Sequence, residues 1–343
     1  MKITLDKIAS VTKNAALTQE VSITENFKPK NGLLLVVEVL EDKKIYNQLE
    51  LASGRLSTLK KGDVLAVALG NRKALKGFVG ETPDKLKAGD IIHILNLGGV
   101  AGICTSENIK EVGHALPVKV LGAITNGKKN LTTKDYKKFE PRKSLTSKVS
   151  LVVVSGTCMN VGKTTVACEI IKKASQEGYT VFGAKLAGIA ALRDTENMND
   201  HGAQESVSFL DAGLTSTVQN NGHVITVTKG AIEFLSKKSA DFIVIEFGDG
   251  VFGEYGVMDI LKDKEIQQNI VAHIGCAHDP MGAMKLAEVC KEIGAPLTVM
   301  SGPVTDNEVG ANFVEKQIGI PALNAYMKAT DLFHYISSKC LKK

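Results

Sequence analysis

The fold of the C-terminal part of this chain is decided by Gly156-Thr157-Cys158-Met159-Asn160-Val161-Gly162-Lys163-Thr164-Thr165. An apolar run rich in β-branched residues, Val149 to Val154, precedes this stretch, and a helical pattern from Val166 to Ala174 follows it. A strand, a glycine-bounded loop, Gly-Lys-Thr and a helix, in this order, are typical of a phosphate-binding loop. The N–H groups of such a loop, and the positive end of the helix dipole, would face the phosphate oxygens of a nucleotide.

Two side chains of the loop have specific expected roles. Lys163 is placed to reach the β- and γ-phosphates, and the hydroxyl of Thr164 is placed to bind Mg²⁺. The commonest pattern, Gly-x-x-x-x-Gly-Lys-[Ser/Thr], would require glycine at Thr157, whereas here the first glycine is Gly156. A chance Gly-Lys-Thr on a surface turn is the alternative, but strand, loop and helix all agree. We therefore expect residues 156–165 to bind the nucleotide.

The bulk composition is that of an ordinary α/β protein. The 343 residues suffice for two domains, and 44 % are hydrophobic while only 5 % are aromatic, so Val, Ile, Leu and Ala must form the core. The net charge of +5 is too mild to indicate a nucleic-acid or membrane partner. None of the six cysteines forms a Cys-x-x-Cys pair, and no signal peptide is visible. We expect a cytoplasmic protein with reduced thiols.

The first part of the chain, residues 1–125, has the patterns of a β-rich domain. Apolar runs separated by glycine turns predict strands at 33–40, 64–69, 91–97 and 117–124. Two of the runs follow the same Gly-Asp turn, Gly62-Asp63 and Gly89-Asp90. This repetition predicts a small β-barrel or sandwich. The Lys- and Arg-rich segment 126–147 is interpreted as an exposed linker, with a polyanion-binding arm as the alternative.

From residue 148 to 343 the sequence alternates between strand and helix patterns. Strands are predicted at 180–186, 241–246, 269–275 and 296–300, and amphipathic helices at 281–293 and 307–318. Right-handed crossovers would give a mostly parallel sheet with helices on both faces. The ligand site is then expected at the carboxyl ends of the strands, where the phosphate loop lies.

The loop resembles that of dethiobiotin synthetase, a member of the P-loop class that includes MinD-like ATPases and amidotransferase-type synthetases. The shared spacing is Gly156-Thr157-x-x-x-Val161-Gly162-Lys163-Thr164. Two further segments, Ala184 to Gly188 and Ile245 to Gly250, resemble that enzyme's strand ending in Lys-Pro and its Val-Glu-Gly-Ala-Gly-Gly segment. The resemblance covers residues 148 to 325 and implies a P-loop NTPase domain with ATP and Mg²⁺ as cofactors. An uncharacterised P-loop family with an unrelated N-terminal domain has a similar loop.

The resemblance, and for Lys185 its position at the end of a predicted strand close to the phosphate edge, indicate roles for four residues outside the loop. Glu246 is expected to bind Mg²⁺ and to be needed for catalysis, and Lys185 is expected to stabilise a transferring phosphoryl group. Asp194 is the expected second metal-binding acid, with Asp249 as the alternative acid or only a turn residue, and Asn307 is the expected adenine contact. The alternatives are a strand-end cap for Glu246, a solvated side chain for Lys185 and a plain acidic loop around Asp194.

The chain also departs from its relatives. Dethiobiotin synthetase is a single domain, and Leu186-Ala187 and Phe247 alter the segments expected to form its substrate pocket. MinD-like ATPases have a signature lysine where this chain has Cys158, which weakens the case for a switch that acts across a homodimer. The favoured hypothesis is an ATP-dependent ligase, synthetase or kinase-like enzyme with a small-molecule substrate. A regulatory NTPase that moves the β-rich domain, and a nucleotide-gated nucleic-acid-binding module, are the alternatives.

Overall fold

The computed structural model describes residues 1–218 and 222–339, which form two compact units. Unit 1 consists of Met1–Lys138, Ile189–Arg193 and Phe209–Val218. Unit 2 consists of Phe139–Gly188, Asp194–Ser208 and Gln219–Lys343. Two short segments of the C-terminal sequence therefore belong to the unit that the N-terminal sequence builds.

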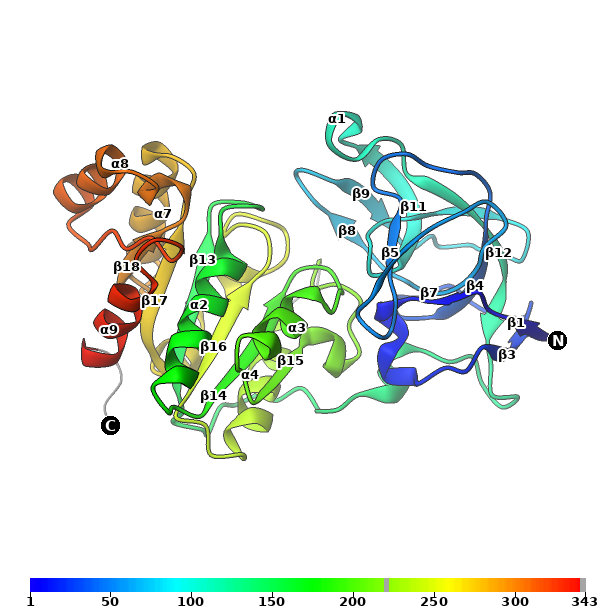
Figure 1. Cartoon of the computed structure of the whole chain (residues 1–343). Coiled ribbons are helices and arrows are strands. Elements are labelled where there is room, and N and C mark those ends of the chain that lie inside the picture. The colour runs from blue at the N-terminus through cyan, green and yellow to red at the C-terminus, as the bar shows by residue number, and fades with distance from the viewer. Residues whose placement is uncertain (219–221, 340–343) are drawn as a thin grey trace. The chain divides into compact units, whose positions relative to one another are not determined.

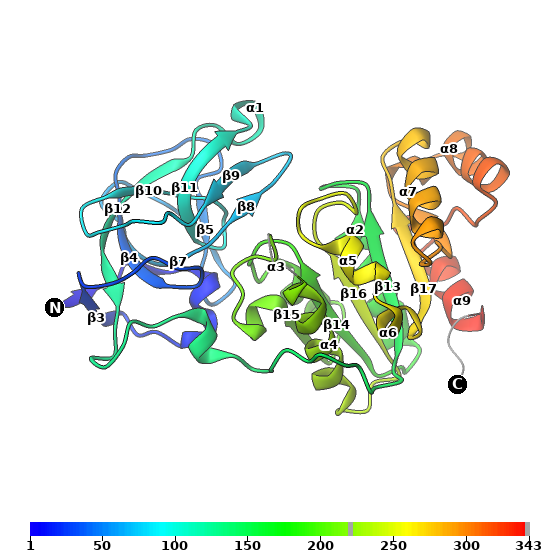
Figure 2. The ribbon, with the colours of Figure 1, turned by 180° about the vertical axis from the view of Figure 1, so that it is seen from behind.

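The strand pairings in unit 1 close a ring of five strands. Figure 1 and Figure 2 show where these strands lie. They are β4 (Leu34–Val39), β7 (Val64–Leu69), β10 (Ile91–Ile94), β11 (Val100–Glu107) and β12 (Leu116–Ile124). β12 pairs with β4 and β10, β10 pairs with β11, β11 pairs with β7, and β7 pairs with β4. The predicted β-rich domain is thus a small barrel, in which closure removes the edges of the ring.

The repeated Gly-Asp turn has the same geometry at both positions in unit 1. Asp63 accepts a hydrogen bond from Lys60 N at 2.7 Å, and Asp90 accepts one from Lys87 N at 2.9 Å. Gly62 and its counterpart in the second turn both have a left-handed backbone, with φ of +88° and +91°. Each turn leads directly into a barrel strand, β7 or β10.

Shorter elements extend the barrel sheet or lie beside it. The sheet continues from the ring through β3 to β1 on one side and through β9 to β8 on the other, and β2 pairs with β7. The extending strands are β1 (Lys2–Thr4), β2 (Lys7–Ile8), β3 (Glu20–Thr24), β8 (Arg72–Lys73) and β9 (Phe78–Glu81). A separate hairpin, β5 (Gln48–Glu50) with β6 (Leu56–Thr58), and one short helix, α1 (Ile109–Val112), complete the named strands and α-helices.

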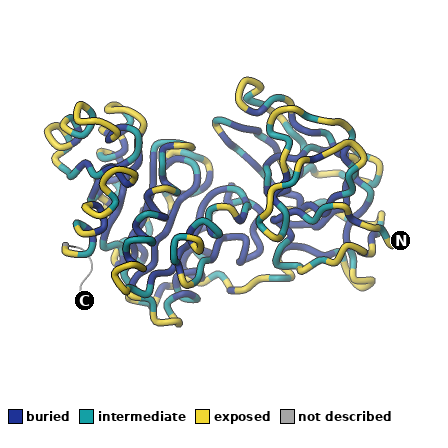
Figure 3. Tube along the Cα trace, in the orientation of Figure 1, coloured by how far each residue is buried: buried dark blue, intermediate teal, exposed yellow. Residues whose placement is uncertain are grey.

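Unit 2 contains a six-stranded sheet in the order β15-β14-β16-β13-β17-β18, and all of its pairings are parallel. The strands are β13 (Ser150–Gly156), β14 (Val181–Ala187), β15 (Glu205–Ser208), β16 (Phe242–Phe247), β17 (Ile270–Cys276) and β18 (Val299–Ser301). The central strands are buried along their length, as Figure 3 shows. Continuous apolar runs such as Leu151 to Val154 are expected where both faces of a sheet are covered.

Helices cover both faces of this sheet, so the predicted α/β fold is confirmed. The α-helices from residue 163 onward are α2 (Lys163–Gln176), α3 (Arg193–Asp200), α4 (His223–Ser236), α5 (Val257–Lys262), α6 (Lys264–Gln267), α7 (Pro280–Glu292), α8 (Glu308–Phe313) and α9 (Ala329–Lys339). α2 and α9 pack together on one face (Figure 1), and α5 and α7 lie on the other (Figure 2). Among the described helices, none combines the length and apolar character needed to cross a bilayer.

The segment 126–147 contains the division between the units, which falls after Lys138. Most of its charged side chains are exposed, but Leu131, Phe139 and Leu145 are buried. The segment also contains a short 3₁₀ helix at Thr133–Tyr136 whose first turn is closed by a capping box. The buried side chains of Leu131, Phe139 and Leu145 therefore fix the segment 126–147 to the folded units at three positions.

Candidate functional site: the phosphate loop and its carboxylates

The predicted phosphate loop connects β13 to α2. β13 ends at Gly156 and α2 begins at Lys163, directly after Gly162 in a left-handed conformation with φ of +87°. A Cβ atom at Gly156 would lie 2.7 Å from Val161 Cγ2 and 2.9 Å from the carbonyl oxygen of Cys276, so only glycine fits. Strand, loop and helix N-terminus therefore have the arrangement that binds phosphate.

The loop lysine points back into its own loop. Lys163 is buried, and its Nζ donates a hydrogen bond to the carbonyl oxygen of Cys158 at 2.6 Å. Burial lowers the pKa of Lys163, and the nearby ammonium of Lys185 lowers it further. The ammonium is thus held at the loop by an acceptor that phosphate oxygens could replace.

Strand register brings the predicted catalytic residues together. Lys185 on β14 is the direct cross-strand neighbour of Glu246 on β16, and Lys185 Nζ lies 2.8 Å from Glu246 Oε1. The hydroxyl of Thr164, in the first turn of α2, donates to the same oxygen at 2.8 Å. Asp194, in the first turn of α3, lies 2.6 Å from Lys185 Nζ through Oδ2. The four side chains come from four different elements of unit 2.

Burial and charge strongly perturb this cluster. Glu246 is only 1 % exposed, and burial raises its pKa although the ammonium of Lys185 opposes the shift. For Lys185 burial acts to lower the pKa, but the carboxylates of Asp194 and Glu246 outweigh burial and raise it above its usual range. Perturbed titratable groups concentrated beside a phosphate loop are a mark of a functional site.

One carboxylate oxygen of Glu246 has no hydrogen-bond partner among the described residues. Oε2 is buried, and no described residue donates a hydrogen bond to it. Buried carboxylate oxygens without partners are costly, so this oxygen is suited to a cation or a water ligand. A hydroxyl and two carboxylates, from Thr164, Glu246 and Asp194, fit Mg²⁺, which also takes phosphate and water oxygens as ligands. Within the described residues no group of three or more His, Cys, Asp or Glu side chains is arranged to hold a metal.

The loops after β16 and β18 pack directly against the phosphate loop. A Cβ atom at Gly250 would lie 2.1 Å from the carbonyl oxygen of Thr157, and one at Gly302 would lie 2.5 Å from that of Val161. Asp249, just before Gly250, has a left-handed backbone with φ of +61°. Because Gly250 and Gly302 have no Cβ atom, the backbone of these two loops can contact the backbone of the phosphate loop.

Asn307 has a structural task that the sequence did not indicate. It is the N-cap of α8, and its Oδ1 accepts hydrogen bonds from Val309 N at 3.0 Å and Gly310 N at 3.2 Å. Asn307 lies in the segment that follows β18, at the carboxyl-end edge of the sheet. An adenine contact would have to use its Nδ2.

A buried polar pair next to the phosphate loop, Ser155 and His273, is not among the residues predicted from the sequence. His273 Nε2 lies 2.7 Å from Ser155 Oγ, and His273 Nδ1 lies 2.8 Å from the carbonyl oxygen of Ala295. The carbonyl can only accept, so Nδ1 donates to it and Nε2 accepts from the hydroxyl. Burial lowers the pKa of His273 to about 4, which keeps the ring neutral. The one signal in the sequence is that His273 is a polar residue within the apolar run 270–276.

A second missed residue is Glu50 in unit 1. This carboxylate is 1 % exposed and accepts hydrogen bonds from Leu192 N at 2.7 Å and Arg193 N at 2.8 Å. The hydroxyl of Ser10 donates to it as well. Nothing in the sequence distinguishes Glu50 from an exposed acid, because these three hydrogen-bond partners are all distant in the chain and two of them are backbone N–H groups.

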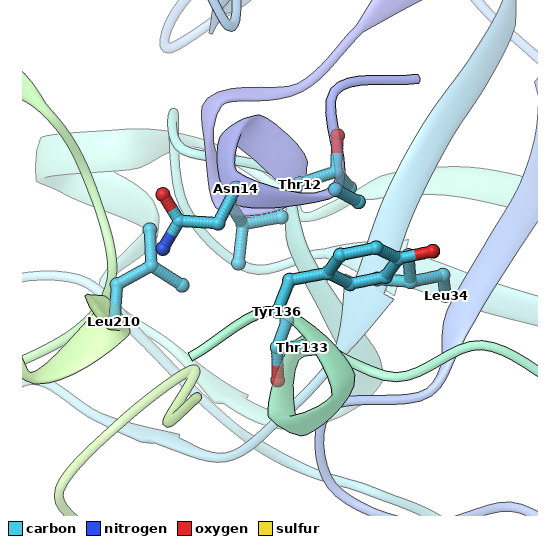
Figure 4. Close-up of a pocket in the computed structure, with 8 residues that line it drawn as sticks. Thr12, Asn14, Leu34, Thr133, Tyr136 and Leu210 are labelled. Carbon is cyan, nitrogen blue, oxygen red and sulfur yellow. The ribbon is translucent and has the colours of Figure 1, made fainter. Parts of the chain in front are cut away.

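Unit 1 also contains a small recess (Figure 4). Thr12, Asn14, Leu34, Thr133, Tyr136 and Leu210 are among the residues that line it. Its free space is about that of one water molecule. The recess is too small for a metabolite.

The chain matches no protein-family model and no curated protein. Among solved structures, it is similar to the signal recognition particle receptor FtsY of Elizabethkingia anophelis in complex with GDP, with 14 % identity over 58 % of this chain and 66 % of that chain, at a TM-score of 0.39. It is similar to the cell division protein FtsY of Thermotoga maritima, with 16 % identity over 56 % of this chain and 66 % of that chain, at a TM-score of 0.39. It is also similar to the signal recognition particle 54 kDa protein of Aeropyrum pernix K1 in complex with GDP. The identity is 18 % over 53 % of this chain and 42 % of that chain, at a TM-score of 0.35.

The chain thus spans about two thirds or less of the length of these three proteins. At these identities and TM-scores, the similarity assigns neither a family nor a function to this chain. The resemblance to dethiobiotin synthetase stays a hypothesis.

Proposed function

We propose that this protein binds a nucleoside triphosphate with Mg²⁺ at residues 156–165 and catalyses transfer of the terminal phosphoryl group. The observation that carries the proposal is the convergence of Thr164, Lys185, Asp194 and Glu246 beside the phosphate loop. The unpartnered Oε2 of Glu246 adds a ligand position within that convergence.

Each group has a role in the proposed reaction. The N-terminus of α2 and the ammonium of Lys163 would hold the phosphates, and Thr164, Glu246 and Asp194 would hold Mg²⁺. Mg²⁺, when bound, would neutralise charge on the phosphate oxygens. Lys185 would stabilise charge that develops on the transferring group. Positioning and charge stabilisation of this kind are the main protein contributions to phosphoryl transfer.

The finer proposal is an ATP-dependent enzyme that activates a small molecule, as a ligase, synthetase or kinase-like enzyme. Its support is the loop spacing and the metal-binding strand that resemble dethiobiotin synthetase. GTP is the competing nucleotide, and titrations with both nucleotides decide between them. Turnover that depends on an added small molecule would support this proposal, whereas turnover stimulated only by RNA or a protein would favour the regulatory alternative.

Lys163→Ala tests the central claim. Loss of the ammonium should weaken binding of Mg²⁺-ATP or Mg²⁺-GTP by at least about a hundredfold, because charge-assisted contacts to phosphate would be lost. Isothermal titration calorimetry measures the affinities. Lys172→Ala is the matched control, since Lys172 lies on the same helix with its side chain 45 % exposed. Unchanged affinity in Lys163→Ala would overturn the proposal.

A further inference from the structure

Lys185 occupies the centre of the proposed metal site. Its Nζ lies 2.8 Å from Glu246 Oε1 and 2.6 Å from Asp194 Oδ2, and its side chain is 11 % exposed. The same Glu246 oxygen also accepts from Thr164 at 2.8 Å. Of the three side chains that would hold Mg²⁺, Glu246 and Asp194 are therefore both ion-paired with Lys185, and Thr164 is hydrogen-bonded to Glu246.

The charges of the cluster set up a competition. Two carboxylates carry two negative charges when ionised, and Lys185 neutralises one of them. Taking an uncompensated charge out of water is expensive, so the ammonium stabilises the buried carboxylates. A divalent cation brought to the same oxygens would lie close to the ammonium, and like charges at short range repel strongly in a buried site.

We propose that Lys185 is a built-in counter-ion that disfavours binding of free Mg²⁺ until a nucleotide is present. This inference rests on the proposed function and adds to it the order in which the metal is accepted. Nucleotide phosphates supply new acceptors for the ammonium, so Lys185 can leave the carboxylates as the metal arrives. The protein would then bind Mg²⁺ together with the nucleotide rather than as a separate ion.

A purely structural ion pair is the competing interpretation, and the chain provides a comparator for it. Lys229 on α4 is also buried between two carboxylates, at 2.8 Å from Asp263 and 2.7 Å from Glu265. These acids lie at the start of α6, away from the carboxyl ends of the strands. Lys229 therefore shares the ion-pair geometry of Lys185 without the phosphate loop.

The test measures Mn²⁺ binding to the nucleotide-free, full-length protein at pH 8 by electron paramagnetic resonance. Lys185→Met should bind Mn²⁺ at least about tenfold more tightly than the wild type, within the range of ordinary coupling between two ligands. Adding Glu246→Gln to that variant should remove the gain, which places the ion at this site. Lys229→Met should leave Mn²⁺ affinity unchanged. Lys185→Gln repeats the test with a polar residue if Lys185→Met does not fold.

The outcomes separate this inference from the proposed function. If the wild type binds nucleotide with Mg²⁺ but Lys185→Met and Lys185→Gln bind Mn²⁺ no more tightly than the wild type, the counter-ion inference is wrong and the proposed function stands. Tight Mn²⁺ binding by the nucleotide-free wild type would overturn the inference as well, and this measurement needs no variant. If the wild type binds neither Mn²⁺ nor nucleotide, the proposed function itself is wrong.

Discussion

At the scale of single residues, Glu246 should contribute more to turnover than to nucleotide binding. Glu246→Gln keeps the size of the side chain and can still accept from Thr164, but it removes the charge next to the proposed metal. We expect turnover to fall by roughly two to four orders of magnitude, on the scale of a catalytic acid or base. Nucleotide affinity should change by less than about tenfold, as for an interaction made chiefly in the transition state.

Steady-state kinetics and calorimetry on the same preparation measure the two effects. Glu265→Gln serves as a control, because Glu265 is also bonded to a lysine but lies outside the site. Equal losses of turnover and affinity would make Glu246 a binding residue. Full activity would transfer the catalytic role to Asp194 or Asp249.

At the residue level, local geometry could be predicted from the sequence where the residues are close in the chain, while the roles of these residues stay predictions. The glycine-bounded loop, Lys163 and the start of α2 follow from one local pattern. The contact between Lys185 and Glu246 could not be derived, because it depends on β16 lying next to β14 in the sheet. The capping role of Asn307 is visible only once α8 is known to begin at Glu308.

At the scale of elements, the free energy of unfolding should depend on pH because β17, which pairs with β13, buries His273. The pKa of His273 falls from an ordinary 6.5 to about 4 because the ring is buried. The unfolded chain therefore binds more protons than the folded chain between these pH values, and stability falls as pH drops below 6.5. This histidine alone should cost about 2 kcal/mol between pH 7 and pH 5.

Urea unfolding at the two pH values measures this dependence. His273→Gln should lose about that part of the pH dependence, whereas His334→Gln, whose side chain is 59 % exposed, should keep it. Identical pH profiles for the wild type and His273→Gln would contradict the assignment. Any effect on nucleotide binding should be indirect, through Ser155 at the end of β13.

Elements were predicted well where apolar runs are bounded by turns, and poorly where the pattern is polar. Strands β4, β7, β16 and β17 lie within about one residue of the predicted ranges. α3 was not predicted, because Arg193 to Asp200 buries only Thr195 and Met198 and shows no apolar stripe. The predicted helix at 307–318 is α8 followed by a π-helical turn at Val314–Ile318.

At the scale of the whole molecule, unit 1 should not fold fully from the N-terminal sequence alone. A fragment that ends at Lys138 lacks Leu192 and Arg193, whose N–H groups satisfy the buried carboxylate of Glu50. It also lacks Ala190, whose carbonyl oxygen accepts from Asn96 at 2.7 Å. Buried polar groups left without partners each cost about 1–3 kcal/mol, and more when charged. We expect the fragment to unfold at much lower urea than the full chain.

Circular dichroism during urea titration of the fragment and of the full chain tests this expectation. Adding Glu50→Ala to the fragment is the internal control, since it removes the unsatisfied carboxylate and should recover part of the lost stability. A fragment with the same cooperative transition as the barrel in the full chain would contradict the expectation.

The interleaving of the two units also limits how this gene can be rearranged. A single crossover between two genes divides a chain at one position, but no single position separates unit 1 from unit 2, because residues 189–193 and 209–218 belong to the barrel unit. Exchange of the barrel for an unrelated module would leave both segments in the recipient without their partners. The barrel and the phosphate-loop unit are therefore expected to be inherited together.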